Sequence, residues 1–123
     1  MAITGRFENQ KRLGRIDEFS GGVERFADKL EWLKKNPLGL EPDKLYVALI
    51  RPYLHYICPC GCGKEVDLPV PSLESDREWR RVRCYPSWKL DLDGKGIVTV
   101  SPSINDLHCG AHYFIEFNKV RWC

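Results

Sequence analysis

The sequence lacks the features that would place a protein in a membrane or send it across one. No apolar run approaches the roughly 20 residues that a membrane-spanning helix needs. The N-terminal stretch MAITGRFENQKRLGRIDEF has no apolar core of the kind found in a signal peptide. We therefore expect a cytoplasmic protein, in which thiols stay reduced.

The sequence also lacks an excess of either charge. The chain has 19 Lys and Arg residues and 17 Asp and Glu residues, which gives a formal net charge of +2. This balance gives no reason to expect nucleic acid or a membrane surface as a partner. The one basic cluster is offset by acidic neighbours; its residues are Arg77, Arg80, Arg81 and Arg83, with Glu74, Asp76 and Glu78 among them.

A chain of 123 residues is long enough for one domain with a modest core. We expect a single domain over residues 1–123, with an N-terminal arm and helix over 1–39 and a core over 40–123. Ser20 offers a helix cap, and the apolar residues after it fall at helical spacing. Lys34 and Lys35 suit a helix C-terminus, and Pro37 follows. The periodic residues are Val23, Phe26, Ala27, Leu30 and Leu33.

Beyond the helix, the sequence pattern predicts strands. KLYVALIRPYLHYI predicts one or two strands around Pro52, and KEVDLPV predicts another. SWKLDLDGKGIVTVS predicts a hairpin that turns at Asp93-Gly94, and HYFIEFNKVRWC a second hairpin that turns at Asn118-Lys119. Residues Pro71 to Arg83 are a polar connection. The expected fold class is α+β, with one N-terminal helix packed on a mainly antiparallel sheet.

Three of the six cysteines crowd into the stretch CPCGCG, as Cys58, Cys60 and Cys62. They are too close together for ordinary mutual disulfides, so metal ligation is the better interpretation. Zinc prefers thiolate ligands in a tetrahedron, and Gly61 and Gly63 permit the positive φ of a tight knuckle. The residues leave the fourth ligand open; the candidates are Cys109, Cys84, Cys123, His55 and His108.

The stretch TVSPSINDLHCGAHYF leaves one predicted strand at Ser101 and enters the next at His112. Connections of this length and composition tend to carry function. Ser103 follows a proline, which restricts the local backbone. Closing the hairpin could bring Ser103 and His112 within hydrogen-bond reach, the minimal arrangement for nucleophilic acyl transfer. The structural alternative is a hydroxyl that caps a turn and a half-buried histidine.

Four segments in this order resemble a bacterial domain family of ubiquitination-like (Bub) operons: LEPDKLYVA, CPCGCGKEVDLPV, VTVSPSI and CGAHYFIEFNKVRW. The resemblance covers about Leu40 to Trp122. It implies a zinc-containing serine peptidase that trims a ubiquitin-like protein, beside homologues of ubiquitin-activating and ubiquitin-conjugating enzymes. The resemblance implies no role for the N-terminal region.

The resemblance assigns roles to residues of this sequence. Cys58, Cys60, Cys62 and Cys109 would be the zinc ligands, and a zinc with four thiolates has no vacant site, so it would be structural. Ser103 would be the nucleophile and His112 the base, with Glu41 as the residue that orients His112 and Asp106 as the local competitor. Backbone N–H groups of Ser103 to Asn105 would stabilise the oxyanion.

The sequence departs from the family pattern at three points. The family often has a histidine where this chain has Tyr56, and His55 stands next to it. The usual glycine after PSI is Asn105, and Asn118-Lys119 stands where a glycine is common. A different class of function also stays open, a non-enzymatic zinc knuckle that binds a protein partner. Such a module would need the cysteines but not Ser103.

Overall fold

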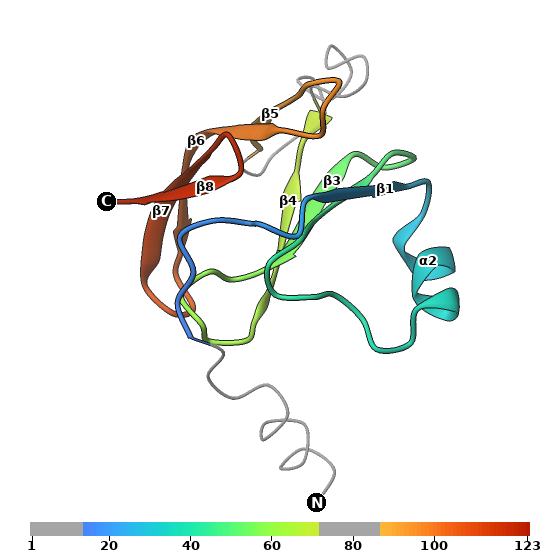
Figure 1. Cartoon of the computed structure of the whole chain (residues 1–123), viewed down its shortest axis with the longest axis horizontal. Helices are drawn as coiled ribbons and strands as arrows, with labels where there is room; N and C mark the ends of the chain where they lie inside the picture. The colour runs from blue at the N-terminus through green and yellow to red at the C-terminus, as the bar shows by residue number, and fades with distance from the viewer. Residues whose placement is uncertain (1–13, 72–86) are drawn as a thin grey trace, which may run out of the picture.

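A computed structural model describes residues 14–71 and 87–123, in which one short helix and eight strands form two four-stranded sheets (Figure 1). The first sheet has the order β1-β2-β3-β4 and the second the order β5-β6-β7-β8. Most of the predicted polar connection from Pro71 to Arg83 lies outside the described residues. The elements are β1 Val23–Phe26, α2 Lys29–Lys35, β2 Leu45–Ala48, β3 Tyr53–Ile57, β4 Glu65–Pro69, β5 Lys89–Leu92, β6 Val98–Asp106, β7 Ala111–Glu116 and β8 Lys119–Trp122.

The predicted helix after Ser20 is wrong in its first half, because Val23–Phe26 forms strand β1, parallel to β2. Pairing with the buried strand β2 overrides the helical spacing of these apolar residues. The helix begins after Asp28, whose side chain accepts a hydrogen bond from the Leu30 N–H at 2.8 Å. It ends at Lys35, so the predicted basic C-terminus is confirmed. Among the described residues, no helix is long and apolar enough to cross a membrane.

The second sheet is an antiparallel meander that contains both predicted hairpins. The first hairpin turns within residues 93–97, one residue later than predicted, and the Asp93 side chain accepts hydrogen bonds from the N–H groups of Lys95 and Ile97. The last turn lies one residue earlier than predicted, at Phe117-Asn118, where both residues have positive φ. Strand β6 continues to Asp106 rather than ending at Ser101, because its later residues pair with β7.

Residues of both sheets share one buried cluster, which includes Leu45, Leu54 and Val100. The hydroxyl groups of Tyr56 on β3 and Tyr113 on β7 lie 2.7 Å apart and join the two sheets by a buried hydrogen bond. Burial raises the pKa of both phenols. Helix α2 lies on the side of the first sheet that faces away from the second sheet (Figure 1). The two sheets therefore present separate outer faces, one covered in part by α2.

Candidate active site

Strand β6 contains a bulge at the sequence Ser101-Pro102-Ser103. These three residues lie opposite Phe114 alone, between the pairs Val100–Ile115 and Ile104–Tyr113. The Ser101–Pro102 peptide bond is cis. A bulge interrupts the ladder and re-aims the side chains that it carries. The indole N–H of Trp88 donates to the Ser103 carbonyl at 3.2 Å and holds the backbone of this segment.

The structure brings Ser103 and His112 together across β6 and β7. His112 pairs with Asn105, two residues after Ser103, and its neighbour Tyr113 is fully buried. Because side chains alternate along a strand, His112 and Ser103 point to the outer face of the second sheet. His112 Nε2 lies 3.1 Å from Ser103 Oγ, within hydrogen-bond reach. A serine hydroxyl can donate its proton to a neutral imidazole at this distance.

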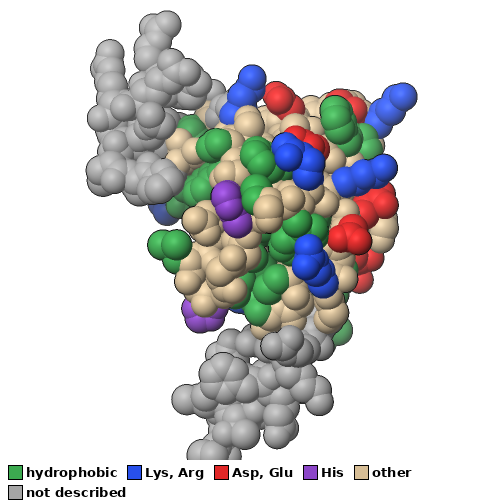
Figure 2. All heavy atoms as spheres, turned by 90° about the vertical axis from the view of Figure 1, so that its left-hand side faces the viewer, with side chains coloured by type: hydrophobic (Ala, Val, Ile, Leu, Met, Phe, Trp, Pro, Cys, Tyr) green, Lys and Arg blue, Asp and Glu red, His purple; other side chains and the backbone are tan. Residues whose placement is uncertain are grey.

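The His112 side chain is exposed, and Ser103 is partly accessible. Figure 2 shows the side of the molecule that carries the second sheet, where histidine lies among hydrophobic and uncharged groups and the acidic side chains gather toward one edge. Two hollows flank Trp88. One adjoins Pro71 and Pro102, and the other runs along Ile104 and Asn105. The first hollow adjoins Pro102 and the second adjoins Ile104, the two residues next to Ser103 in the sequence.

The two carboxylates proposed to orient His112 have other contacts. Glu41 is 68% exposed in its side chain and lies 3.9 Å from Lys44 Nζ. Asp106 is 9% exposed, lies 3.7 Å from Lys64 Nζ and accepts a hydrogen bond from the His108 N–H. Asp106 is next to Asn105 on β6, so strand alternation directs its side chain away from the face of His112. Within residues 14–71 and 87–123, Ser103 is the side-chain partner of the His112 ring.

Four cysteines converge where the knuckle meets the turn between β6 and β7. The ligand atoms of Cys58, Cys60, Cys62 and Cys109 all lie within 4.8 Å of one another. The Cys58–Cys60 sulfur distance is 3.5 Å, and Cys109 Sγ lies 3.7 Å from both of these sulfurs. A tetrahedral zinc with Zn–S bonds of about 2.3 Å needs sulfurs about 3.8 Å apart, whereas a disulfide needs about 2.05 Å. The four thiols therefore fit a zinc ion and are not disulfide-bonded.

The backbone of the knuckle explains its glycines. Gly61 and Gly63 have φ values of 93° and 83°, as predicted for a tight turn. A Cβ on Gly61 would lie 2.9 Å from the backbone of Gly14, so this position also permits the N-terminal segment to approach. The Cys58 N–H donates to the Lys64 carbonyl at 2.8 Å and closes the loop. Of the other predicted ligands, Cys123 is exposed and outside the cluster, and Cys84 lies outside the described residues.

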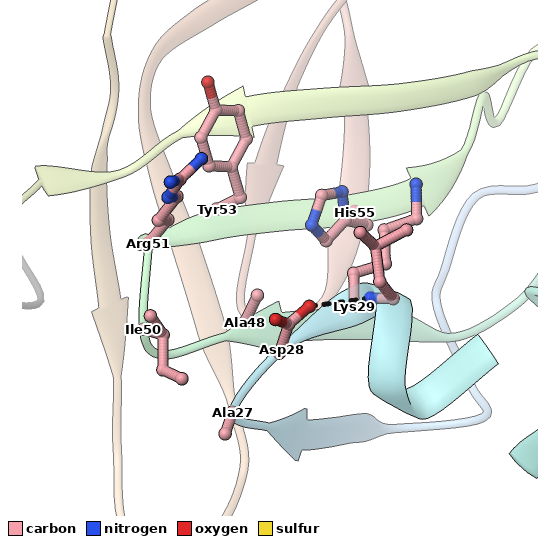
Figure 3. Close-up of a pocket in the computed structure, with 9 residues that line it drawn as sticks. Ala27, Asp28, Lys29, Ala48, Ile50, Arg51, Tyr53 and His55 are labelled. Atoms are coloured by element: carbon pink, nitrogen blue, oxygen red, sulfur yellow. Dashed lines mark hydrogen bonds between the residues drawn. The ribbon is translucent and has the colours of Figure 1, made fainter. Parts of the chain in front are cut away.

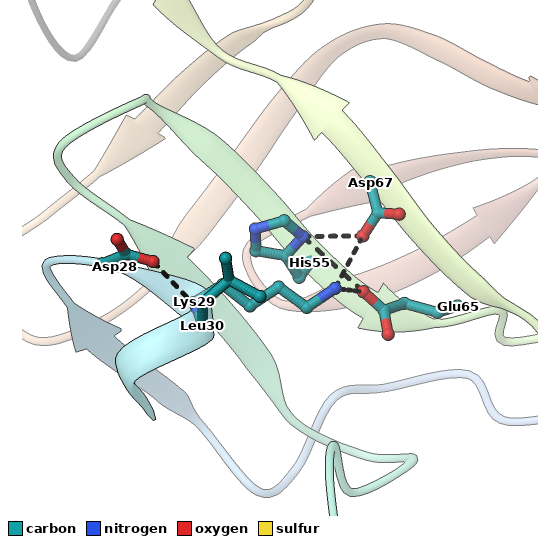
Figure 4. A network of polar contacts seen from close by, with 6 residues as sticks. All are labelled: Asp28, Lys29, Leu30, His55, Glu65 and Asp67. Atoms are coloured by element: carbon teal, nitrogen blue, oxygen red, sulfur yellow. Dashed lines mark hydrogen bonds and ion pairs between the residues drawn. The ribbon is translucent and has the colours of Figure 1, made fainter. Parts of the chain in front are cut away.

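A cluster of polar side chains around His55 lies on the outer face of the first sheet, and the sequence analysis did not predict it. His55 Nδ1 lies 2.6 Å from Asp67 and 3.8 Å from Glu65, while Lys29 of α2 forms an ion pair with Glu65 (Figure 4). Burial raises the pKa of Asp67, but hydrogen bonds with His55 and Glu65 and the charge of Lys29 outweigh it, so the pKa is lowered. The alternation in KEVDLPV puts Glu65 and Asp67 on one face, which was the available signal.

A pocket of about 410 Å³ adjoins His55 (Figure 3). Its wall includes Asp28, Lys29, Ile50, Arg51 and Tyr53. Neither serine nor cysteine is among the residues that line it. His55 and Asp67 resemble the base and carboxylate of a hydrolase, but no serine or cysteine lines this pocket beside them.

The model of one protein family matches residues 32–123, and its description is bacterial ubiquitination-like system serine protease, BubE. The chain belongs to the BubE family. The match extends slightly beyond the predicted resemblance at Leu40 to Trp122, and it makes the chain a member of a family of hydrolases. Membership also implies partners in a ubiquitin-like pathway. No curated protein and no solved structure gives a significant match.

Proposed function

We propose that this BubE family protein is a serine peptidase that cleaves at the C-terminus of a bacterial ubiquitin-like protein. The observation that carries the proposal is the 3.1 Å contact between Ser103 Oγ and His112 Nε2 on an exposed face. The family match supplies the class of reaction and the pathway. The cleavage would expose the residue that an activating enzyme uses, and the same chemistry could release the ubiquitin-like protein from conjugates.

The proposed mechanism uses the serine and the histidine in two half-reactions. His112 takes the proton of Ser103 as Oγ attacks the scissile carbonyl carbon. Backbone N–H groups at the bulge, such as that of Ser103, stabilise the oxyanion. His112 then gives the proton to the leaving amine as the C–N bond breaks. A water molecule attacks the acyl-enzyme, transfers its proton through His112 and releases the new carboxyl end together with free Ser103.

In this proposal, the four cysteines hold a structural zinc. Four thiolates leave the ion without an open coordination position, so it supplies no bound water for catalysis. Cys109 lies in the turn between β6 and β7, the two strands that carry Ser103 and His112. Zinc binding would therefore fasten this hairpin to the knuckle of the first sheet. The ion would fix the relative position of the two reacting side chains.

The deciding experiment uses the ubiquitin-like protein of the same Bub operon, extended at its C-terminus by a short peptide. The wild-type protein should remove the extension, and mass spectrometry should give one defined cut. Ser103→Ala should stop cleavage without changing zinc content. Cleavage that chelators stop but Ser103→Ala leaves intact would indicate a metallopeptidase. Tight binding of the ubiquitin-like protein without cleavage would favour the non-enzymatic zinc knuckle.

A further inference from the structure

A groove of about 440 Å³ begins beside the Ser103 segment and separates β4 from the second half of β6. Trp88 closes its end near Ser103, because its backbone N–H donates to Pro69 of β4 and its indole N–H donates to the Ser103 carbonyl of β6. Ile104 and Asn105 form the wall along β6. The groove therefore leads along β6 toward the proposed nucleophile.

The wall formed by β6 is an open strand edge. The His112 carbonyl accepts a hydrogen bond from the Cys123 N–H at 3.0 Å, so His112 directs its backbone groups away from β6. In an antiparallel ladder, Asn105, which lies opposite His112, must then direct its N–H and C=O away from β7 and toward the groove. Strand β5 covers this side of β6 only as far as the pair Lys89–Ser101. In the described part of the chain, the backbone groups of Asn105 have no strand partner.

We infer that this groove binds the extended tail of the substrate as an additional strand along β6. An unpaired N–H and C=O on a strand edge are complementary to an extended peptide, which supplies the same two groups at the same spacing. The tail would lie beside β6 on the same side as β5, beyond the point where β5 ends its pairing with β6. This inference rests on the proposed function, and it specifies how the peptidase holds its substrate.

The direction of the bound tail follows from the sheet. All strand pairs of the second sheet are antiparallel, and the position beside Asn105 is on the side of β6 that pairs with β5. An antiparallel tail passes Asn105 first and reaches Ser103 afterwards. The residues that precede the scissile bond therefore lie in the groove. The folded body of the ubiquitin-like protein would lie at the far end, near Leu107 and His108.

The test uses synthetic peptides with the tail sequence of the operon's ubiquitin-like protein, each methylated at one backbone nitrogen. Binding to the full-length Ser103→Ala protein is measured by titration, and cleavage by the wild type is measured by mass. Methylation should weaken binding about 10-fold or more at the one tail residue opposite Asn105 and much less at its two neighbours, because Asn105 directs its N–H and C=O to the groove whereas Ile104 and Asp106 pair with β7. Matched peptides with single alanine substitutions control for side-chain contacts. Amide hydrogen exchange of Asn105 should slow on peptide binding, whereas that of the already paired Tyr113 should not.

The outcomes separate the two claims. Cleavage with equal effects of methylation at all tail residues, or without protection of Asn105, overturns the inference and leaves the proposed function standing. Cleavage of the extended ubiquitin-like protein while the isolated tail fails to bind also overturns the inference. If neither the protein nor the peptide is cut, the proposed function falls, and the inference falls with it.

Discussion

Two histidines, His112 and His55, lie on strands of different sheets and differ in their exposure and their partners. His112 on β7 is exposed and lies against a serine hydroxyl. His55 on β3 is 7% exposed and is held by carboxylates of β4, which a lysine of α2 contacts in turn. A catalytic base needs both access to substrate and a group to deprotonate. The comparison shows that a well-formed histidine–aspartate pair can serve packing, whereas a sparsely partnered histidine can have the geometry of a catalyst.

The cluster around His55 has a structural explanation. Lys29 lies at the start of α2, and its ion pair with Glu65 attaches the helix to the outer face of the first sheet. The Trp32 ring of the same helix stacks on Phe26, with ring centroids 5.2 Å apart. This docking buries polar groups together with their partners, and no buried side-chain nitrogen or oxygen in the described residues lacks a hydrogen bond.

The largest expected effect is the loss of activity when either Ser103 or His112 is replaced. Ser103→Ala and His112→Ala should each lower the cleavage rate by about 10³-fold or more, because each removes a group that takes part in bond making. Ser101→Ala, two residues away on the same bulge, should keep its activity. His55→Ala should lower the melting temperature but leave the rate of the folded protein near wild type. Loss of catalysis in His55→Ala with the fold intact would reverse our assignment.

The orienting carboxylate is tested by amide substitutions at Glu41 and Asp106. An amide can hold the wrong tautomer of a histidine, so the true partner should lower turnover by up to about 10⁴-fold. The other substitution should change turnover little, although Asp106→Asn also weakens the contact with Lys64. Steady-state kinetics on both variants would decide. Near wild-type turnover for both would mean that neither of these two carboxylates orients His112.

Removal of one proposed zinc ligand should lower activity indirectly, because it destabilises the fold that positions Ser103 and His112. The wild type should contain about one zinc per chain, and Cys60→Ser should lower zinc content, stability and activity together, because metal binding is coupled to folding. Cys123→Ser is the matched control, since this thiol is exposed and outside the cluster. Elemental analysis and thermal unfolding provide the measurements. A metal-free wild type of full stability would exclude the zinc.

The pH dependence of cleavage should distinguish the two histidine sites. A general base must be neutral to accept a proton, and histidine changes its charge between about pH 5 and 8. The rate should therefore rise through this range and then level off. Residual activity of His112→Ala should lose this rise, whereas His55→Ala and His108→Ala should keep it. A flat profile in the wild type would remove histidine from the mechanism.

The smallest expected effect concerns Asp67. Its pKa is lowered in the folded protein, so it stabilises the fold above the ordinary aspartate pKa, and this contribution is lost as the pH falls below about 4. The contribution should be about 1 kcal/mol or less, because the side chain is 44% exposed and water screens its charge. Asp67→Asn should unfold at a lower temperature than wild type at pH 7, and the difference should shrink in acid. Asp91→Asn on β5 is the exposed control, and a difference that grows in acid would contradict the assignment.

Sequence reasoning predicted most strands, because alternation and the Asp93-Gly94 turn are local signals. The predicted helix began too early, because Val23 and Phe26 are compatible with either a helix or a strand. Only their pairing with β2 decides between the two. The bulge before Ile104 was not predictable, since it depends on how β6 and β7 align. The His55 cluster was missed because its members come from three elements that meet only in the folded chain.

The cysteine cluster also fixes an order of assembly during synthesis. Cys58, Cys60 and Cys62 leave the ribosome together, whereas Cys109 follows 51 residues after Cys58. Ser103 and His112 lie on either side of Cys109 in the sequence. A nascent chain can therefore form its knuckle long before it possesses a reactive pair. Because Cys109 lies between the two proposed catalytic residues, the cluster gains its fourth thiol after Ser103 has been made and before His112 has.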